Sequence, residues 1–343
     1  MGRRKNIVTI AVSLIVLGGI MATLGFLTGG NRSVMLGRDG FKVYDGGDYI
    51  KENKDLEKFT AIDVDMDFGD IEIIKSDKYA IELEFDKEVM KLTYSVSNDK
   101  LTISSENKEG NKFINLNLNF GSINNKSKVK IYVPADIVLN SLDIESNSGS
   151  ITINNIDIND SNINCDFGDI NLDSINGNKL NINSKSGTVK IKNMKLDELT
   201  LFVDFGDIDT ENIYAANFKL NSKSGEVNTK LLTSNTIEIN SDFGDIDASG
   251  LVSNGLLINA KSGTVNLAGA LKGSNVINCD FGDIDIDTNL AKNQYSYSVD
   301  MDFGSSKIDG IKADGDTEVT NDSAENNFDI NCKSGDLKIQ FSK

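Results

Sequence analysis

The sequence has no histidine, no tryptophan and a single proline, Pro134, and its last arginine is Arg38. From residue 39 onward the chain therefore lacks an imidazole for acid–base catalysis or metal ligation, an indole to stack on a sugar, and a guanidinium to clamp a phosphate. Because these groups serve most enzyme and cofactor sites, we predict no catalytic residue and no cofactor.

Basic residues are also scarce, with 35 lysines and arginines against 52 aspartates and glutamates and a formal net charge of -17. Such a chain is repelled by the phosphate backbone that dominates nucleic-acid affinity, so nucleic acid is excluded as a partner. With 39% apolar and 25% charged residues, the 343-residue composition is nevertheless that of a folded globular protein.

The N-terminus has the pattern of a membrane anchor. Three basic residues, Arg3, Arg4 and Lys5, precede an uncharged run from Ile7 to Leu27. As a helix this run covers roughly 30 Å, the thickness of a bilayer core. The basic side predicts a cytoplasmic N-terminus, so residues 1–30 are expected to form a basic tip and transmembrane helix, with an extracellular ectodomain. A cleaved signal peptide is the alternative.

A repeat of nineteen residues organises the rest of the chain. Glycines of Asp-Phe-Gly and Lys-Ser-Gly tripeptides follow one another at this interval, at Gly149, Gly168, Gly187, Gly206, Gly225, Gly244, Gly263 and Gly282. Looser copies stand at Gly69, Gly121, Gly304 and Gly335. A unit this short cannot bury its own apolar face, so the copies are expected to stack on one another.

Apolar and polar residues alternate on both sides of each glycine, which indicates two short strands joined at a bend. We therefore predict an all-β fold, a single-stranded β-solenoid with about nineteen residues per coil. One inward column would hold Ile163, Ile182, Leu201, Leu220, Ile239, Ile258 and Ile277, and the other Ile170, Val189, Ile208, Val227, Ile246, Val265 and Ile284. An outward asparagine ladder would hold Asn164, Asn183, Asn221, Asn240, Asn259 and Asn278.

The charge two residues before each glycine alternates along the chain, as Asp166, Lys185, Asp204, Lys223, Asp242, Lys261 and Asp280. With one repeat per coil, each aspartate has lysine neighbours, whereas a coil of thirty-eight residues would stack like charges. The residue before each glycine alternates in the same way. We expect Phe167, Phe205, Phe243 and Phe281 to interleave with Ser186, Ser224 and Ser262 inside the core.

The chain is expected to divide into four regions. Residues 31–58 would be a juxtamembrane spacer after the anchor of residues 1–30. Residues 59–343 would form the solenoid, with 59–135 as an irregular N-terminal cap of antiparallel strands and 136–343 as the regular repeats.

The basic anchor, the run from Phe59 to Ile73 and the recurring DFGDI and KSGTV units together resemble the bacterial putative-adhesin family of β-strand-repeat proteins. The resemblance covers about residues 56–343. It implies a membrane-anchored or secreted envelope protein, in some members associated with envelope stress, and it brings no established catalytic residues.

Aspartates around the repeat glycines are the only candidates for a metal site. Oxygen-rich clusters can bind Ca²⁺, which takes about six to eight oxygen ligands. The candidate ligands are Asp204, Asp207, Asp209, Asp280, Asp283 and Asp285. Because the lysine of each intervening coil would compete for the same carboxylates, a solvated, salt-bridged face is favoured over a metal site.

The three cysteines, Cys165, Cys279 and Cys332, all occupy a small inward position three residues before a glycine. Counting along the chain places Cys279 and Cys332 about two coils apart, beyond the roughly 7 Å limit for a disulfide. Buried free thiols are expected.

These patterns favour a single-pass membrane protein whose acidic ectodomain has a non-enzymatic binding, adhesion or scaffold role at the cell envelope. Possible partners are the membrane, through the N-terminal helix, and cell-envelope polymers, cationic peptides or another surface protein. One alternative is an accessory or sensor component of an envelope-stress response that binds cationic peptides or wall polymers. A second alternative, and a less favoured one, is an enzyme that acts on polysaccharides through carboxylates alone.

Overall fold

The computed structural model describes Gly18 and residues 33–37, 40–44, 49–87, 90–107, 127–313, 316–321 and 323–342. None of the helices within these residues is long and apolar enough to cross a membrane. The predicted anchor, residues 7–27, lies outside the described part of the chain apart from Gly18. Within the expected spacer, β1 (Ser33–Gly37) and β2 (Gly40–Tyr44) pair as an antiparallel hairpin, and β3 (Tyr49–Asp55) follows.

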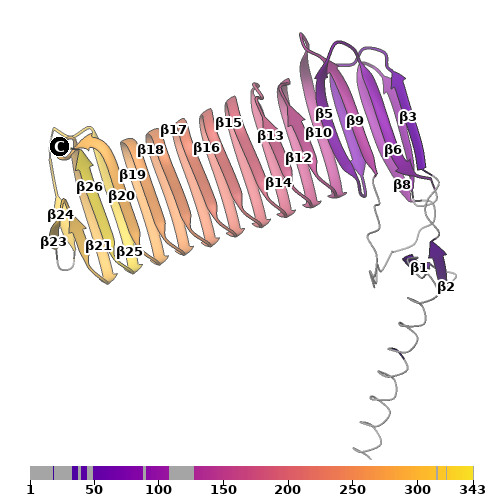
Figure 1. Ribbon diagram of the computed structural model, residues 1–343. Helices are drawn as coiled ribbons and strands as arrows, with labels where there is room; N and C mark the ends of the chain where they lie inside the picture. The colour runs from indigo at the N-terminus through magenta and orange to yellow at the C-terminus, as the bar shows by residue number, and fades with distance from the viewer. Residues whose placement is uncertain are drawn as a thin grey trace, which may run out of the picture. The chain divides into compact units, whose positions relative to one another are not determined.

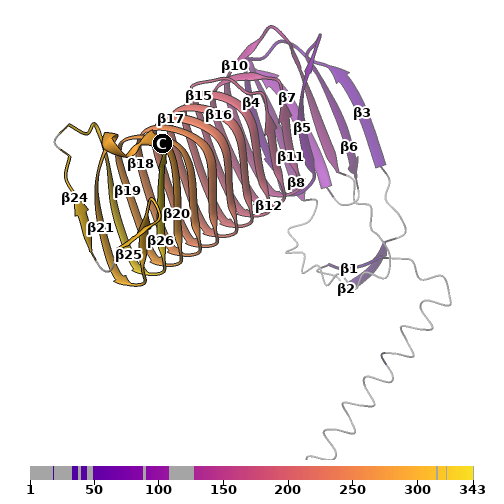
Figure 2. The same ribbon diagram turned by 60° about the vertical axis from the view of Figure 1, so that its left-hand side comes forward.

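Residues 51–84, 92–106 and 127–343 form one compact unit, a rack of parallel coils (Figure 1). Its middle consists of long strands that each bend through one whole coil and pair in parallel with the next (Figure 2). These strands are β15 (Val189–Phe205), β16 (Ile208–Ser224), β17 (Val227–Phe243), β18 (Ile246–Ser262) and β19 (Val265–Phe281).

The strand register confirms the all-β solenoid and its nineteen residues per coil. Ile208 pairs with Val227 in the next coil, and Leu220 pairs with Ile239. The coils before β15 keep this register as pairs of shorter strands. They are β10 (Val138–Ser148), β11 (Ile151–Asn154), β12 (Asp157–Phe167), β13 (Ile170–Asp173) and β14 (Lys179–Ser186).

Each coil contributes to two walls of the rack, one before its repeat glycine and one after it, and the core is the space between these walls. Both predicted inward columns are confirmed, since every member from Ile163 to Ile277 and from Ile170 to Ile284 is at most 1% exposed. Because each coil supplies the apolar cover that its neighbours lack, burial is continuous along the rack.

The N-terminal end differs from the antiparallel cap expected for residues 59–135. β4 (Ala61–Met66) and β5 (Asp70–Ser76) form a true coil that pairs in parallel with β10 and β11. β8 (Lys100–Asn107) and β9 (Lys128–Pro134) add parallel strands beyond that coil, and β7 (Met90–Ser97) precedes β8. β6 (Ala80–Asp86) runs antiparallel to β9. The loose copy at Gly69 keeps the buried residues Val64 and Ile71, so it stacks as the regular coils do.

At the other end, the order of coils in space departs from the order in sequence. β20 (Ile284–Ala291), a short 3-10 turn (Lys292–Gln294), β21 (Tyr295–Phe303) and β22 (Ser306–Ile308) follow β19 along the chain. The last strands, β25 (Asn326–Ser334) and β26 (Leu337–Ser342), then insert between the coil of β19 and β20 and the coil of β21 and β22. β25 pairs with β19 on one side and β21 on the other, while β26 pairs with β20 and β22. β23 (Ile311–Ala313) and β24 (Thr317–Val319) pair antiparallel with β22 and β21.

This insertion corrects the expected separation of two cysteines. Cys279 on β19 and Cys332 on β25 are register partners in adjacent strands, not two coils apart. All three thiols are nevertheless buried and free, as predicted. Burial raises the pKa of Cys165 to about 11, which keeps this thiol protonated and unreactive at neutral pH.

Candidate binding surface

The glycines of the repeat lie in one line along a corner of the rack. Each repeat glycine in the described part of the chain has a positive φ, which for Gly225 is +129°. The loose copy predicted at Gly121 lies outside the described residues. A Cβ on Gly225 would lie 2.1 Å from the carbonyl oxygen of Gly206 in the preceding coil. Only glycine satisfies both the conformation and the close approach, so every coil turns at the same place.

The residue before each described repeat glycine lies at this corner, where Phe68 and most of the serines are half-buried and the other phenylalanines are exposed. The prediction that the phenylalanines of the regular repeats are buried in the core is therefore wrong. The exposed fractions are 61% for Phe167, Phe205 and Phe243, 64% for Phe281 and 75% for Phe303. These residues end their strands, so the alternation that buries Cys165 and Val203 does not continue into the turn. We call them, with the serines between them, the corner column.

Phenylalanine and serine alternate along the corner column in spatial order, not in sequence order. In the sequence, Phe281 is followed by Phe303 and then by Ser334. The inserted C-terminal coil places Ser334 opposite Phe303 and next to the coil of Phe281. The pairs Ser148–Phe167, Phe167–Ser186, Ser186–Phe205, Phe205–Ser224, Ser224–Phe243 and Ser262–Phe281 continue the same alternation.

A charged column runs beside the corner column, one residue earlier in each coil. Each lysine pairs with the aspartate of a neighbouring coil, as the sequence predicts. The Nζ–Oδ distances are 2.7 Å for Lys185–Asp166 and Lys223–Asp204, and 2.6 Å for Lys261–Asp242 and Lys333–Asp280. Exposed pairs of this kind contribute at most about 1 kcal/mol each, so their main effect is to keep unlike charges adjacent.

Five of the six aspartates predicted as calcium candidates form a hydrogen bond or ion pair with a neighbouring coil, each with its own partner. Asp207 and Asp283 each accept a hydrogen bond from a backbone N–H of a neighbouring coil, those of Glu226 and Asp336. Asp204 and Asp280 pair with lysines of the charged column, and Lys338 donates to both carboxylate oxygens of Asp285. Asp209 is half-buried on β16. The described residues contain no group of three or more acids or cysteines that could hold a metal ion.

The predicted asparagine ladder is confirmed on the wall that ends at the corner. Side-chain amides donate from coil to coil at 2.8 Å for Asn183–Asn164, 2.9 Å for Asn240–Asn221 and 2.7 Å for Asn259–Asn240. The ladder continues through Asn278 to Asn331 of the inserted coil, at 2.8 and 2.9 Å. The inserted coil therefore keeps the outward column as well as the inward ones.

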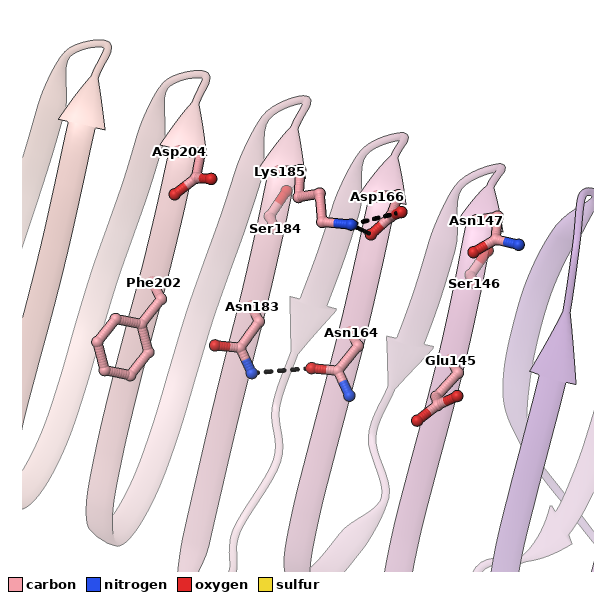
Figure 3. Close-up of a pocket in the computed structure, with 10 residues that line it drawn as sticks. All are labelled: Glu145, Ser146, Asn147, Asn164, Asp166, Asn183, Ser184, Lys185, Phe202 and Asp204. Carbon is pink, nitrogen blue, oxygen red and sulfur yellow. Dashed lines mark hydrogen bonds and ion pairs between the residues drawn. The ribbon is translucent and has the colours of Figure 1, made fainter.

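Phe202 interrupts the ladder and borders a hollow in the wall. It pairs in register with Asn183 and Asn221 and is 42% exposed. Figure 3 shows its ring beside the Asn183–Asn164 hydrogen bond and below the Lys185–Asp166 ion pair. The Nδ2 atom of Asn221 is buried without a hydrogen-bond partner in the structure, because the residue before it in the column offers no oxygen.

Repairing the ladder is expected to stabilise the protein. In Phe202→Asn, an amide would meet both Asn183 and Asn221, and each added hydrogen bond contributes about 0.5–1.5 kcal/mol. After the loss of partly buried ring surface, we expect a net gain of about 1 kcal/mol in the free energy of unfolding. Urea denaturation checks this. Phe202→Ala is the control, because it removes the ring without supplying an amide, and an equal gain from it would contradict the explanation.

Stability is expected to fall at high pH. Hydrogen bonding to Asp280 raises the pKa of Lys333, and burial followed by the hydrogen bond to Glu52 raises the pKa of Tyr94 to about 12. A group whose pKa is raised in the folded state stabilises that state fully at pH values below its ordinary pKa, which is 10.5 for lysine and 10.0 for tyrosine. This stabilisation is lost as the pH rises through the pKa of the folded state. The midpoint of thermal unfolding should therefore drop from about pH 10 upward. Tyr94→Phe should flatten part of this drop, and an unchanged profile would contradict the assignment.

Sequence reasoning missed the exposure of the corner phenylalanines and the hollow at Phe202. The exposure of the phenylalanines was indicated by the strict alternation of Asp-Phe-Gly with Lys-Ser-Gly. The identity of a core residue rarely depends on the charge of the residue beside it. The gap between Asn183 and Asn221 in an otherwise regular column was the signal for the hollow.

Comparison with known proteins places these repeats in a family. A family model described as Toastrack DUF4097 matches residues 59–231 and 214–343. No curated protein matches the chain. Among solved structures, a putative adhesin from Bacteroides fragilis is 13% identical, covers 86% of this chain and 98% of its own, and has a TM-score of 0.36. A putative lipid binding protein from Parabacteroides distasonis is 15% identical with the same coverage and a TM-score of 0.43. A putative adhesin from Parabacteroides merdae is 14% identical, again with the same coverage, with a TM-score of 0.29.

Proposed function

Because the chain belongs to the Toastrack DUF4097 family, which confirms the resemblance seen in its sequence, we propose that it is a non-enzymatic binding protein of the cell envelope with an adhesion or scaffold role. The observation that carries the proposal is the repetition of one exposed pattern along the rack. Five phenylalanines and four lysine–aspartate pairs recur in a fixed register at one corner. A surface that repeats along the rack suits a large, extended binding partner better than a small-molecule substrate.

The absence of an imidazole anywhere in the chain supports a role without catalysis. The repeated carboxylates beside the corner, which could replace it, are tied to neighbouring coils. Asp166, Asp204, Asp242 and Asp280 each have a lysine partner, and Asp169, Asp207, Asp245 and Asp283 each accept a backbone N–H. A glycosidase would need two carboxylates facing one bond with different proton affinities. The regular spacing of identical carboxylates favours a structural and binding role.

The proposed location is the outer face of a membrane, with the N-terminal segment as a single-pass anchor. The support is the basic tip followed by the uncharged run of residues 7–27. On intact bacterial cells that produce the full chain, a membrane-impermeant amine-reactive biotin should label lysines of the rack. The chain should also stay with the membrane fraction in high salt. A variant that lacks residues 7–27 is the control. Labelling only after lysis would overturn the location.

The binding role is tested by displaying the chain on cells and measuring their attachment to one another and to surfaces coated with cell-wall polymer. Increased attachment relative to cells without the chain supports the proposal. Salt-sensitive binding of a cationic peptide without attachment would favour the envelope-stress role, since the chain carries a net charge of -17. Shortening of a purified acidic polysaccharide by the chain would overturn the non-enzymatic assignment.

A further inference from the structure

We propose that the corner column binds a second copy of this chain, with the two racks antiparallel and shifted so that the phenylalanines of one enter the serine gaps of the other. As an account of adhesion, this rests on the function proposed above. As a property of the protein in solution, it stands on the geometry of the corner alone.

The spacing of the corner column fits an incoming phenylalanine. Neighbouring parallel strands lie about 4.8 Å apart, so phenylalanines in alternate coils lie about 9.6 Å apart. A serine such as Ser186, Ser224 or Ser334 occupies each coil between them. A ring inserted over the serine lies about 4.8 Å from the ring on either side, within the 4.5–7 Å range of stacked aromatic pairs. The column is thus a row of knobs and holes with one period.

The charged column makes the same shifted alignment favourable. Aspartate precedes each phenylalanine and lysine precedes each corner serine of the Lys-Ser-Gly coils, as at Asp204–Phe205 and Lys223–Ser224. When a phenylalanine coil of one copy lies opposite a serine coil of the other, aspartate therefore faces lysine in both directions. An unshifted alignment places phenylalanine against phenylalanine and like charges against each other, which is disfavoured on both counts.

Symmetry selects the antiparallel arrangement. Two parallel racks related by a two-fold axis place each coil opposite its own copy, which is the disfavoured unshifted alignment. Two antiparallel racks can place every phenylalanine coil opposite a serine coil and still form a closed, self-complementary pair. The inserted C-terminal coil extends this alternation to the end of the rack, because Lys333 and Ser334 separate the coils of Phe281 and Phe303.

The apolar area available matches a reversible dimer. A phenylalanine side chain exposes roughly 100–150 Å² when about 60% accessible, so five of them offer about 500–750 Å² in each copy. Two copies would bury about 1,000–1,500 Å², near the lower end of specific interfaces. The net charge of -17 on each copy opposes association away from the corner, which limits the dimer to this surface.

The first test is sedimentation velocity of the full chain in a mild non-ionic detergent over a range of concentrations. Wild type is expected to form a dimer, and the combined variant Phe167→Ser, Phe205→Ser, Phe243→Ser, Phe281→Ser and Phe303→Ser should raise the dissociation constant at least tenfold. The variant should fold, because serine already occupies this position in alternate coils. A control variant, Tyr214→Ser with Val252→Ser, removes exposed apolar side chains that lie outside the corner column. A monomeric wild type, or equal loss in the control, would overturn the proposal.

The second test fixes the orientation by joining lysine to carboxylate with a zero-length cross-linker and mapping the products by mass spectrometry. Antiparallel racks bring Lys185 of one copy to Asp242 or Asp280 of the other, depending on the shift. Within one chain these coils are three and five coils apart, about 14 and 24 Å, too far for such a link. Dimer products that lack these links would overturn the antiparallel arrangement.

A lipid surface is the other apolar partner that exposed phenylalanines could enter. Flotation of a monomeric chain with phosphatidylcholine vesicles, lost in the five-phenylalanine variant, would assign the corner to a membrane and overturn the dimer. Surface display without dimerisation would overturn this inference and leave the proposed function standing. Dimerisation without surface display would have the opposite consequence.

Discussion

Gly225→Ala is expected to lower the free energy of unfolding by about 2–6 kcal/mol, one of the largest effects of any single substitution in this chain. The backbone of Gly225 has a φ of +129°, which costs any other residue about 1–3 kcal/mol. The new Cβ would lie 2.1 Å from the carbonyl oxygen of Gly206, and overpacking of this kind costs about 1–3 kcal/mol more. Urea denaturation followed by circular dichroism measures the change.

The matched control for this substitution is Gly255→Ala. Gly255 lies in β18 of the same rack, but the atoms nearest to a Cβ at this position would be 3.7 and 3.9 Å away, an ordinary contact distance. Its φ is outside the positive range, so alanine meets no strain there. The free energy of unfolding should change by less than about 1 kcal/mol. Similar losses for the two variants would show that the corner line is not the constraint inferred from the structure.

Deletion of residues 326–343 is expected to unfold the end of the rack and not merely to shorten it. β25 is the strand that pairs in parallel with β21, and β26 pairs in parallel with β22. Without them, the coil of residues 295–308 would have to stack directly on β19 and β20. That contact would put Asp302 next to Asp280 and Phe303 next to Phe281, where the inserted coil supplies Lys333 and Ser334. Removing the inserted coil also uncovers the buried side chains Ile277 and Val299.

Hydrogen–deuterium exchange is the measurement for this deletion. Amides of residues 284–308 should lose protection by several orders of magnitude, because local opening there would approach zero cost. Coils far from the cut, such as β12 and β14, serve as the internal control and should keep their protection, since repeat proteins couple only nearest neighbours. Undiminished protection at residues 295–308 would mean that this coil folds without the inserted one.

Several local features of the rack follow from the sequence because each depends only on neighbours at a fixed interval. The two inward columns, the coil length, the lysine–aspartate pairs and the asparagine ladder all repeat every nineteen residues. Side chains alternate between the two faces of a strand, so a shift of one residue in the strand register would move the buried apolar residues to the surface. The nineteen-residue period therefore specifies the register in which Leu220 packs against Ile239. The family resemblance depended on the same repeat.

The candidate binding surface was predictable in composition but not in exposure. The sequence shows phenylalanine and serine alternating with charge, yet period-two alternation places both inside the core. Phe205 is exposed because the strand ends there and Gly206 turns the chain, and the distance from the core at a corner depends on how both walls meet. Periodicity along one strand carries no information about that junction.

By itself, the sequence determined an acidic, all-β stack of nineteen-residue coils, because side-chain period and charge alternation are local properties of the chain. Only the tertiary structure decided which coils are neighbours where the interval is irregular. It set the coil of Gly69 against β10 and β11, and it inserted the C-terminal coil so that Cys332 lies beside Cys279. The physical reason is that a coil can join any free edge that matches its columns, and the entropy of closing a long loop changes slowly with the loop's length.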